Sequence, residues 1–226
     1  EKAIACIHDL PGVGQHLHDH VDVVQVMNAP KLTDSFGLSF TGIANMVKGI
    51  FEWRKHRTGP LTTNFAEAGG FVKSDPSERT PDLQFHFVIG KLVNHGRSTV
   101  FGHGYSCHVC LLRPLSRGSV TLASKDPFAA PVIDPNFLGV REDMERLRKG
   151  VRLMRELLGQ PALAGLGGKE MAHSAQAKTD LQIEQFVRDY ADTIYHPVGT
   201  CRMGNGPLDV VDHELRVHGV QGLRVV

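Results

Sequence analysis

The sequence predicts an α+β fold in which an antiparallel sheet is flanked by helices. Residues 83–89 alternate apolar and mixed side chains, and residues 21–27 are rich in β-branched side chains, as strands are. Residues 142–158 carry apolar side chains at helical spacing. Strands that follow one another as a meander, with helices set between them, are typical of the layered α+β class.

The strand expected at residues 83–89 has two chemically different faces. One face carries apolar side chains only: Leu83, Phe85, Phe87 and Ile89. The other carries Gln84, His86 and Val88. Because side chains alternate across a strand, we expect a sheet with a buried apolar face and a mixed face suited to the floor of a pocket. The alternative, that His86 lies on a solvent face, stays open.

The next strand is expected over residues 105–112 and contains a C-x-x-C sequence, Cys107 and Cys110. Residues three apart in a strand point to opposite faces. These thiols are therefore not expected to share a metal ion or to form a disulfide. Residues 118–123 begin a further strand and continue the meander.

A helix is expected over residues 40–56, with an apolar stripe formed by Ile43, Met46, Val47, Ile50 and Phe51. We expect the stripe to pack on the protein's own core. Basic residues nearby leave peripheral membrane association, at the inner face of a membrane, as the alternative. Lys48 interrupts the run, which argues against a membrane-spanning helix.

Two further helices are expected in the second half of the chain. The helix over residues 142–158 ends before Gly159 and Pro161. Residues 162–178 are small and polar and are expected to form a loop. Thr179 and Gln182 then form a capping box, and the helix that they open leads to residues 195–196.

The composition is that of an ordinary globular chain. It has 226 residues, 41% hydrophobic and 22% charged, with a formal net charge of +1. A nucleic-acid-binding surface would give a strong basic bias, so we expect no nucleic-acid partner. The four cysteines are few for this length and indicate reduced thiols in a cytoplasmic compartment.

Residues 195–204, YHPVGTCRMG, are the strongest functional signal in the sequence. Pro197 has a fixed φ and restricts His196 to extended backbone. Glycines at positions 199 and 204 permit close backbone approach. A single imidazole on a rigid backbone suits a general base, whose position matters before its pKa does.

Four segments together resemble the glucose–methanol–choline (GMC) family of flavin oxidoreductases, in particular its choline-dehydrogenase-like alcohol dehydrogenases. They are residues 195–204, residues 9–20 (DLPGVGQHLHDH), residues 67–71 (EAGGF) and residues 113–120 (RPLSRGSV). They occur in the family's order and span nearly the whole chain. The resemblance is specific to the family but not to one substrate.

The resemblance implies oxidation of an alcohol to an aldehyde, with transfer of a hydride to FAD. His196 would be the catalytic base. Tyr195, Glu67 and His86 would contact the substrate, and Pro197 and Val198 the cofactor. A carboxylate such as Glu67 suits a cationic alcohol such as choline, although a structural role in the glycine turn is an equal alternative. The alcohol and the electron acceptor are left open.

The dinucleotide-binding motif of such enzymes, G-x-G-x-x-G, is not found in the sequence. The resemblance therefore implies that residues 1–226 form the substrate-binding, C-terminal part of the enzyme. Residues 1–20 and 205–226 would connect it to the FAD domain, and a second catalytic residue would lie outside this chain. We expect residues 1–226 alone to be inactive and free of FAD.

Two other classes of function remain open. One is a non-catalytic ligand-binding module with the same fold. The other is a metal-dependent protein that uses His16, His18 and His20, which share a face in an extended segment. The resemblance instead gives Asp19 and His20 structural polar contacts and predicts no metal site here.

Overall fold

The computed structural model describes residues 2–226 and contains two compact units. The sheet unit comprises residues 21–113 and 144–192. The motif unit comprises the residues up to 20, residues 114–143 and residues 193–226. No sequence pattern indicates this division, because the motif unit is assembled from three separate segments of the chain.

The sheet unit is built on antiparallel strands, as predicted. The strand order is β3 (Ala66–Val72), β4 (Leu83–Val88), β5 (Gly102–Leu111), β1 (Val21–Asn28) and β8 (Lys169–Glu170). A short strand β2 (Gly37–Leu38) pairs with β5. The register places His86 opposite His108, and Gln84 and Asp22 both opposite Cys110. The predicted mixed face of β4 is thus continued across β5 and β1.

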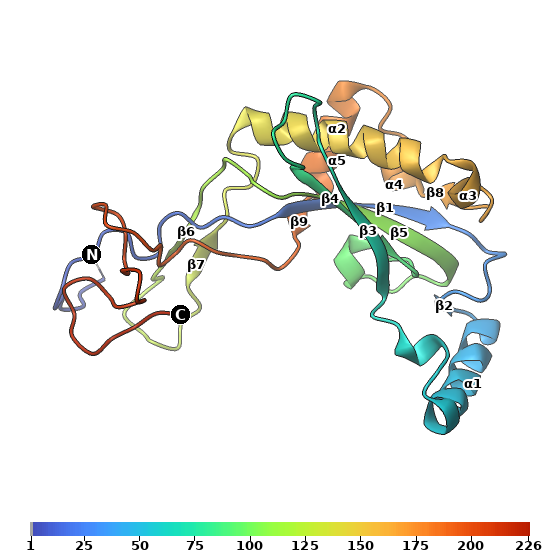
Figure 1. Cartoon of the computed structure of the whole chain (residues 1–226), viewed down its shortest axis with the longest axis horizontal. Helices are drawn as coiled ribbons and strands as arrows, with labels where there is room; N and C mark the ends of the chain where they lie inside the picture. The colour runs from blue at the N-terminus through green and yellow to red at the C-terminus, as the bar shows by residue number, and fades with distance from the viewer. Residues whose placement is uncertain (1) are drawn as a thin grey trace. The chain divides into compact units, whose positions relative to one another are not determined.

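The apolar face of this sheet is covered by helix α2 (Arg141–Leu158), which lies across the strands in Figure 1. Met144, Leu147, Val151 and Met154 are fully buried. Gly150 lies where a Cβ atom would come within 2.8 Å of the Val109 side chain and 3.1 Å of Leu83. The close approach of helix and sheet therefore depends on a glycine at this point. The expected helix over residues 142–158 is confirmed.

Helix α5 (Asp180–Tyr190) begins at the predicted capping box and ends before β9 (Asp192–Thr193). The Gln182 backbone N–H donates to Thr179 Oγ1 at 3.3 Å, and the Thr179 N–H donates to Gln182 Oε1 at 3.0 Å. Ile183 and Val187 are fully buried. The helix is therefore fixed both by its cap and by its apolar face.

Replacement of Thr179 by alanine should lower the free energy of unfolding by about 1 kcal/mol, because the first turn loses a side-chain acceptor. Urea unfolding followed by circular dichroism measures this change. Thr99 is an exposed threonine outside any helix, and Thr99→Ala should change stability by less than ~0.5 kcal/mol. Equal effects of the two substitutions would show that the capping box contributes nothing.

Residues 162–178 are more ordered than a loop, contrary to the prediction. They contain most of the short helix α3 (Pro161–Ala164), strand β8 and the short helix α4 (Ala172–Ala175). β8 pairs with the end of β1. The Arg155 guanidinium donates to Glu170 Oε1 at 3.0 Å and to the Ser174 carbonyl at 2.7 Å. Tertiary contacts, not local sequence, stabilise this segment.

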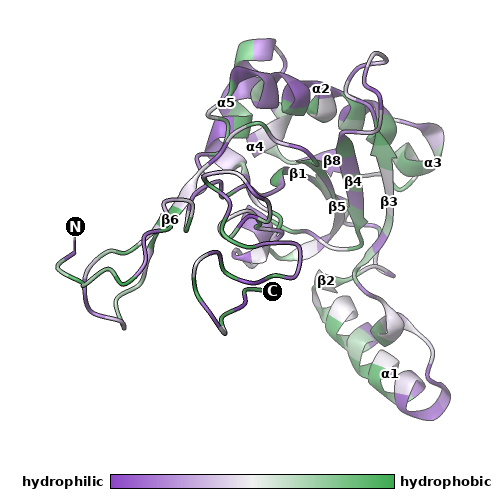
Figure 2. Ribbon diagram, turned by 60° about the vertical axis from the view of Figure 1, so that its left-hand side comes forward, coloured by the Kyte–Doolittle hydropathy of each residue, from purple (hydrophilic) through white to green (hydrophobic). Residues whose placement is uncertain are grey.

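Helix α1 (Phe40–His56) forms where predicted but does not pack on the core of the described chain. Ser39 caps it by accepting the Gly42 N–H at 2.9 Å, yet Gly49 is its only buried residue. Ile43 is 58% and Phe51 69% exposed. Both views show the helix extending away from the sheet (Figures 1 and 2), and green apolar positions run along it in Figure 2. The expected burial of the stripe is therefore wrong for residues 2–226.

The inner side of α1 lines a cavity of about 550 Å³ together with the 3₁₀ turns η1 (Pro60–Thr62) and η2 (Asn94–Gly96) and nearby loops. Ile43 and Met46 face this space with Phe36 and Phe65. Within residues 2–226, no helix is both long and apolar enough to cross a bilayer.

The motif unit has little regular structure and a small core. Strands β6 (Ser119–Thr121) and β7 (Val132–Asp134) form an antiparallel pair. Val210, Val211 and Val217 are buried against Leu10 and Cys201. Backbone hydrogen bonds join its separate segments, as between Leu17 and Gly118 (3.0 and 2.7 Å).

Candidate active site

The segment that carries His196 is held against residues 14–20 of the motif unit by backbone hydrogen bonds. His18 and Val198 exchange N–H to carbonyl bonds at 3.0 and 2.9 Å. The Ile194 N–H donates to the His20 carbonyl at 3.2 Å, and the Gly14 N–H donates to the Thr200 carbonyl at 2.8 Å. Two of the segments that carry the family resemblance therefore form one structure, although they are far apart in the sequence.

Asp19 is the residue that fixes the backbone before His196. The residue is only 6% exposed. Oδ1 accepts the His196 backbone N–H at 3.0 Å, and Oδ2 accepts the Thr193 hydroxyl. Thr193 Oγ1 in turn accepts the Tyr195 N–H at 2.7 Å. Tyr195 has a φ of 68°, a strained value for a non-glycine residue, and these hydrogen bonds stabilise it.

His196 is exposed, and its ring contacts a second imidazole. Its Nδ1 lies 3.2 Å from Nδ1 of His20, and the two rings meet edge to face with centroids 5.2 Å apart. When the His196 Nδ1–H donates to His20, the Nε2 of the neutral His196 ring keeps its lone pair. That nitrogen can then accept a proton from a substrate hydroxyl. The geometry suits a general base when His196 carries its proton on Nδ1.

The prediction that Asp19 and His20 make structural polar contacts is confirmed, and the structure shows which contacts these are. The sequence could not reveal that both residues act on His196, because they lie 177 and 176 residues from it. Thr193 was missed altogether. Its position two residues before Tyr195 is the local signal that could have found it, because threonine hydroxyls often bond the backbone two residues on.

If His196 is a catalytic base, Asp19→Asn in the complete protein should lower kcat by about 10- to 100-fold, because an amide offers one acceptor where two are needed and small displacements of a catalytic group are costly. Flavin content should not change. Asp9 is an exposed acid of the same segment, so Asp9→Asn is the control and should leave kcat unaltered. Full activity in Asp19→Asn would contradict a positioning role for Asp19.

The histidines of residues 16–20 have separate contacts. The His18 ring Nδ1 lies 2.9 Å from the His16 carbonyl, and His20 contacts His196. Among residues 2–226, the compact group of potential metal ligands is Asp22, His95 and His108 instead. This second group was not predicted from the sequence.

The other predicted substrate residues, Glu67 and His86, belong to the sheet unit. Glu67 is exposed at a register shift of β3. His86 is half-buried on the mixed face, with its ring centroid 6.4 Å from that of His108. Tyr195, Pro197 and Val198 are exposed residues of the motif unit, next to His196. The predicted site residues are therefore divided between the two units.

The two thiols of the C-x-x-C sequence lie on opposite faces of β5, as the alternation predicts. Cys107 is opposite Gln25 and Cys110 is opposite Asp22. Burial raises the pKa of the Cys107 thiol to about 12. A thiol with such a pKa is largely protonated at neutral pH and makes a poor nucleophile.

Known proteins resemble both the sequence and the fold. The chain is 42% identical over 226 residues to an alcohol dehydrogenase [acceptor] of Pseudomonas putida, covering 100% of this chain and 41% of that protein. It is 38% identical over 224 residues to an oxygen-dependent choline dehydrogenase of Cronobacter sakazakii, covering 99% of the chain and 40% of that enzyme. The chain thus spans about two-fifths of the length of these relatives.

Two solved structures share the fold. A formate oxidase of Aspergillus oryzae matches with a TM-score of 0.84 at 27% identity, over 99% of this chain and 44% of that chain. A pyridoxine 4-oxidase of Mesorbium loti matches with a TM-score of 0.76 at 23% identity, over 100% of this chain and 40% of that chain. The family model described as GMC oxidoreductase matches residues 114–226, which are half of the chain and include His196. The chain therefore belongs to the GMC oxidoreductase family.

Proposed function

We propose that the protein containing this chain oxidises an alcohol to an aldehyde with FAD, and that His196 is the catalytic base. The observation that carries the proposal is the fixed position of His196, whose backbone is bonded to the buried Asp19 and whose ring contacts His20. Family membership and the names of the relatives support the reaction class.

The base acts on the substrate hydroxyl. Nε2 of His196 takes the hydroxyl proton while the C–H bond of the same carbon releases its hydride, so that the alcohol loses both and becomes the aldehyde. Removal of the proton makes the carbon a better hydride donor. The hydride acceptor is FAD when it is bound. The contact of His196 Nδ1 with His20 keeps the ring in place during the transfer.

Two apolar residues that follow His196 in the sequence are exposed and are proposed cofactor contacts. The Val198 side chain is 56% exposed and lies beside Pro197, which is also exposed. The Val198 N–H and carbonyl are both bonded to His18. The backbone of Val198 is therefore already hydrogen-bonded, so that its apolar side chain is the part left for contact. Pro197 has no N–H. We assign both residues to cofactor contact by van der Waals packing.

The phosphates of FAD need a site that we do not find in this chain, because a glycine-rich loop before a helix is missing from the sequence. We therefore expect residues 1–226 alone to bind no FAD and to be inactive. We propose that residues 1–20 and 205–226, both in the motif unit, connect the chain to the FAD domain.

Tyr195, Glu67 and His86 are proposed substrate contacts. Choline is a cationic alcohol, and the Glu67 carboxylate makes no hydrogen bond within the described part of the chain. If Glu67 attracts such a substrate, Glu67→Gln should raise KM for choline by about fivefold, since the attraction between exposed opposite charges is about 1 kcal/mol. KM for an uncharged primary alcohol should stay the same. An equal change in both KM values would show that Glu67 does not recognise the charge of the substrate.

The exposed stripe of α1 also supports a proposal of peripheral membrane association. Phe40 is 96% exposed, and the last turn of the helix carries Arg54, Lys55 and His56. Apolar and basic residues together favour an anionic membrane surface. Co-sedimentation of the complete protein with anionic vesicles, lost in Phe51→Ser and absent with neutral vesicles, is the expected result. No sedimentation with either kind of vesicle would refute it.

The test of the proposed function is an anaerobic titration of the complete protein with a panel of alcohols. We expect a visible flavin spectrum that bleaches with at least one alcohol. A flavin spectrum that no alcohol bleaches would contradict the proposed oxidation of alcohols. A complete protein without flavin that still binds alcohols would favour the binding-module alternative.

A further inference from the structure

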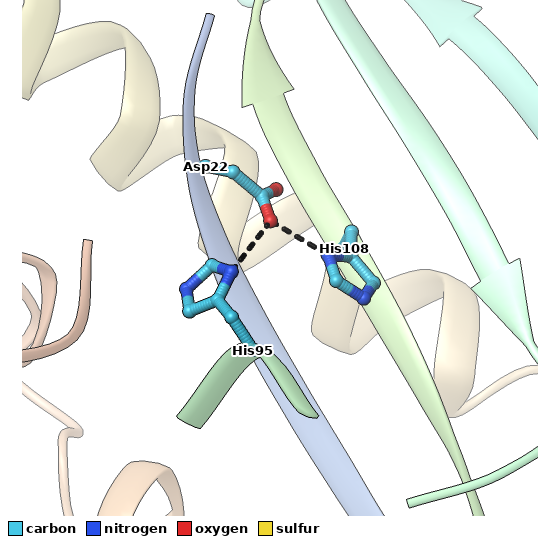
Figure 3. A group of neighbouring side chains, drawn as sticks. All are labelled: Asp22, His95 and His108. Atoms are coloured by element: carbon cyan, nitrogen blue, oxygen red, sulfur yellow. Dashed lines mark hydrogen bonds and ion pairs between the residues drawn. The ribbon is translucent and has the colours of Figure 1, made fainter. Parts of the chain in front are cut away.

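A buried carboxylate in the sheet unit is surrounded by imidazole rings. Asp22 on β1 and His108 on β5 lie on the same face of the sheet, and their Oδ2 and Nδ1 atoms are 2.6 Å apart. His95, from η2, points its Nδ1 at the same oxygen from 3.7 Å, as Figure 3 shows. One ligand atom from each residue lies within 4.8 Å of the other two.

All three side chains are withdrawn from solvent. Asp22 is 0% exposed, His95 7% and His108 8%. Asp22 Oδ1 and His108 Nε2 are buried without a hydrogen-bond partner in the described chain. Burial raises the pKa of Asp22, and the opposing effects of His108, His95 and His86 do not cancel it. The cluster as it stands therefore leaves the cost of burying a carboxylate partly uncompensated.

The tautomer of His95 is fixed by its other nitrogen. Nε2 lies 3.3 Å from the carbonyl of Tyr190, which can only accept. Nε2 therefore carries the proton, and the Nδ1 of the neutral ring turns a lone pair towards the carboxylate oxygen. Such a lone pair repels the carboxylate unless a cation lies between them, which is either a proton that makes the ring an imidazolium or a metal ion. The bond from Nε2–H to a backbone carbonyl is also the outer-shell contact typical of metal-binding histidines.

We propose that Asp22, His95 and His108 bind a divalent transition-metal ion such as Zn²⁺. Two histidines and one carboxylate form a common zinc set, which leaves a fourth position for water. Ligand atoms about 2.1 Å from a tetrahedral ion are about 3.4 Å apart. The observed separations of 2.6 and 3.7 Å from Asp22 Oδ2 lie on either side of this value. The two histidine nitrogens lie within 4.8 Å of each other, so side-chain shifts of about 1 Å would bring the three atoms to these separations.

Binding of the ion displaces the proton that His108 and Asp22 share. The proton of the neutral His108 ring then lies on Nε2, for which the described chain provides no acceptor, while Nδ1 binds the ion. The site does not depend on His196 or on FAD, and its occupancy can be measured whether or not the proposed oxidation is correct.

The experiment uses the complete protein, purified without a histidine tag and stripped with a chelator. Zn²⁺ titration should show one ion per chain, and Co²⁺ should give the visible absorption of a tetrahedral site. Asp22→Asn and His95→Gln should each weaken Zn²⁺ binding at least about 100-fold, more than loss of an outer-shell partner does. The double variant His16→Gln/His18→Gln is the control, and its Zn²⁺ binding should match the parent.

A second variant covers the case in which the buried substitutions fail to fold. His95→Cys keeps a ligand, and its Co²⁺ complex should gain a thiolate charge-transfer band that the parent lacks. Binding below one ion per chain, or equal affinity in the parent and Asp22→Asn, would overturn the proposal. The cluster would then be a hydrogen-bonded Asp–His pair without metal. The absence of the charge-transfer band in folded His95→Cys would overturn it as well.

Discussion

Replacement of His196 by alanine in the complete enzyme should lower kcat and kcat/KM by about 10²- to 10⁴-fold, the usual contribution of a general base. In the proposed reaction, alanine removes the nitrogen that accepts the hydroxyl proton. It keeps the backbone N–H that donates to Asp19, so the local backbone should persist. Flavin absorbance and the melting temperature should stay close to those of the parent.

The control for this substitution is His213→Ala. His213 is an exposed histidine of the motif unit, so its replacement tests the loss of an imidazole other than the proposed base. Steady-state assays of both variants with the same alcohol give the comparison. Equal activities of parent and His196→Ala would exclude His196 as the base.

Gly199→Ala should be among the most destabilising single substitutions near the site. Gly199 has a φ of +103°, and a Cβ atom would lie 2.2 Å from the His16 carbonyl oxygen. The unfavourable φ costs about 1–3 kcal/mol, and relief of the overlap costs a further ~1–3 kcal/mol. The contacting atom of His16 belongs to the backbone and cannot rotate away, so the neighbouring His18–Val198 pairing must move. Activity should therefore fall together with stability.

Two other glycines separate these contributions. Gly222 has a φ of +75° and no atom within 4 Å of the point where a Cβ would lie, whereas Gly70 has open space and no left-handed φ. Gly222→Ala should therefore show the effect of φ alone, and Gly70→Ala should be close to neutral. Chemical unfolding should give Gly199→Ala the lowest free energy of unfolding of the three variants. A Gly199→Ala protein as stable as Gly222→Ala would refute the close approach to His16.

The regular elements could be predicted because their signals are local. The alternation of residues 83–89 predicted β4, the stripe of residues 142–158 predicted α2, and Thr179 with Gln182 predicted the start of α5. The exposure of α1 could not be predicted, because an apolar stripe does not specify what will cover it. The division into two units depends on contacts between segments that are distant in the sequence, so no periodic pattern in the sequence indicates it.

The candidate site likewise contains residues that could be predicted from local sequence and residues that could not. His196 stands in a rigid, glycine-containing motif, so it could be proposed as the base from the sequence and its family resemblance. Its partners Asp19 and His20 come from the other end of the chain. The Asp22–His95–His108 cluster was missed because β1 and β5 bring together residues 86 positions apart, and because His95 reaches them from a turn with a φ of 51°.

The most direct measurement of the role of His196 is the rate of flavin reduction by alcohol in a single anaerobic turnover, with and without added imidazole. In His196→Ala the rate should be slow, and it should rise in proportion to imidazole, because the free base replaces the missing one. The parent and His213→Ala should not respond. A rate in His196→Ala within about twofold of the parent, unchanged by imidazole, would contradict proton abstraction by His196.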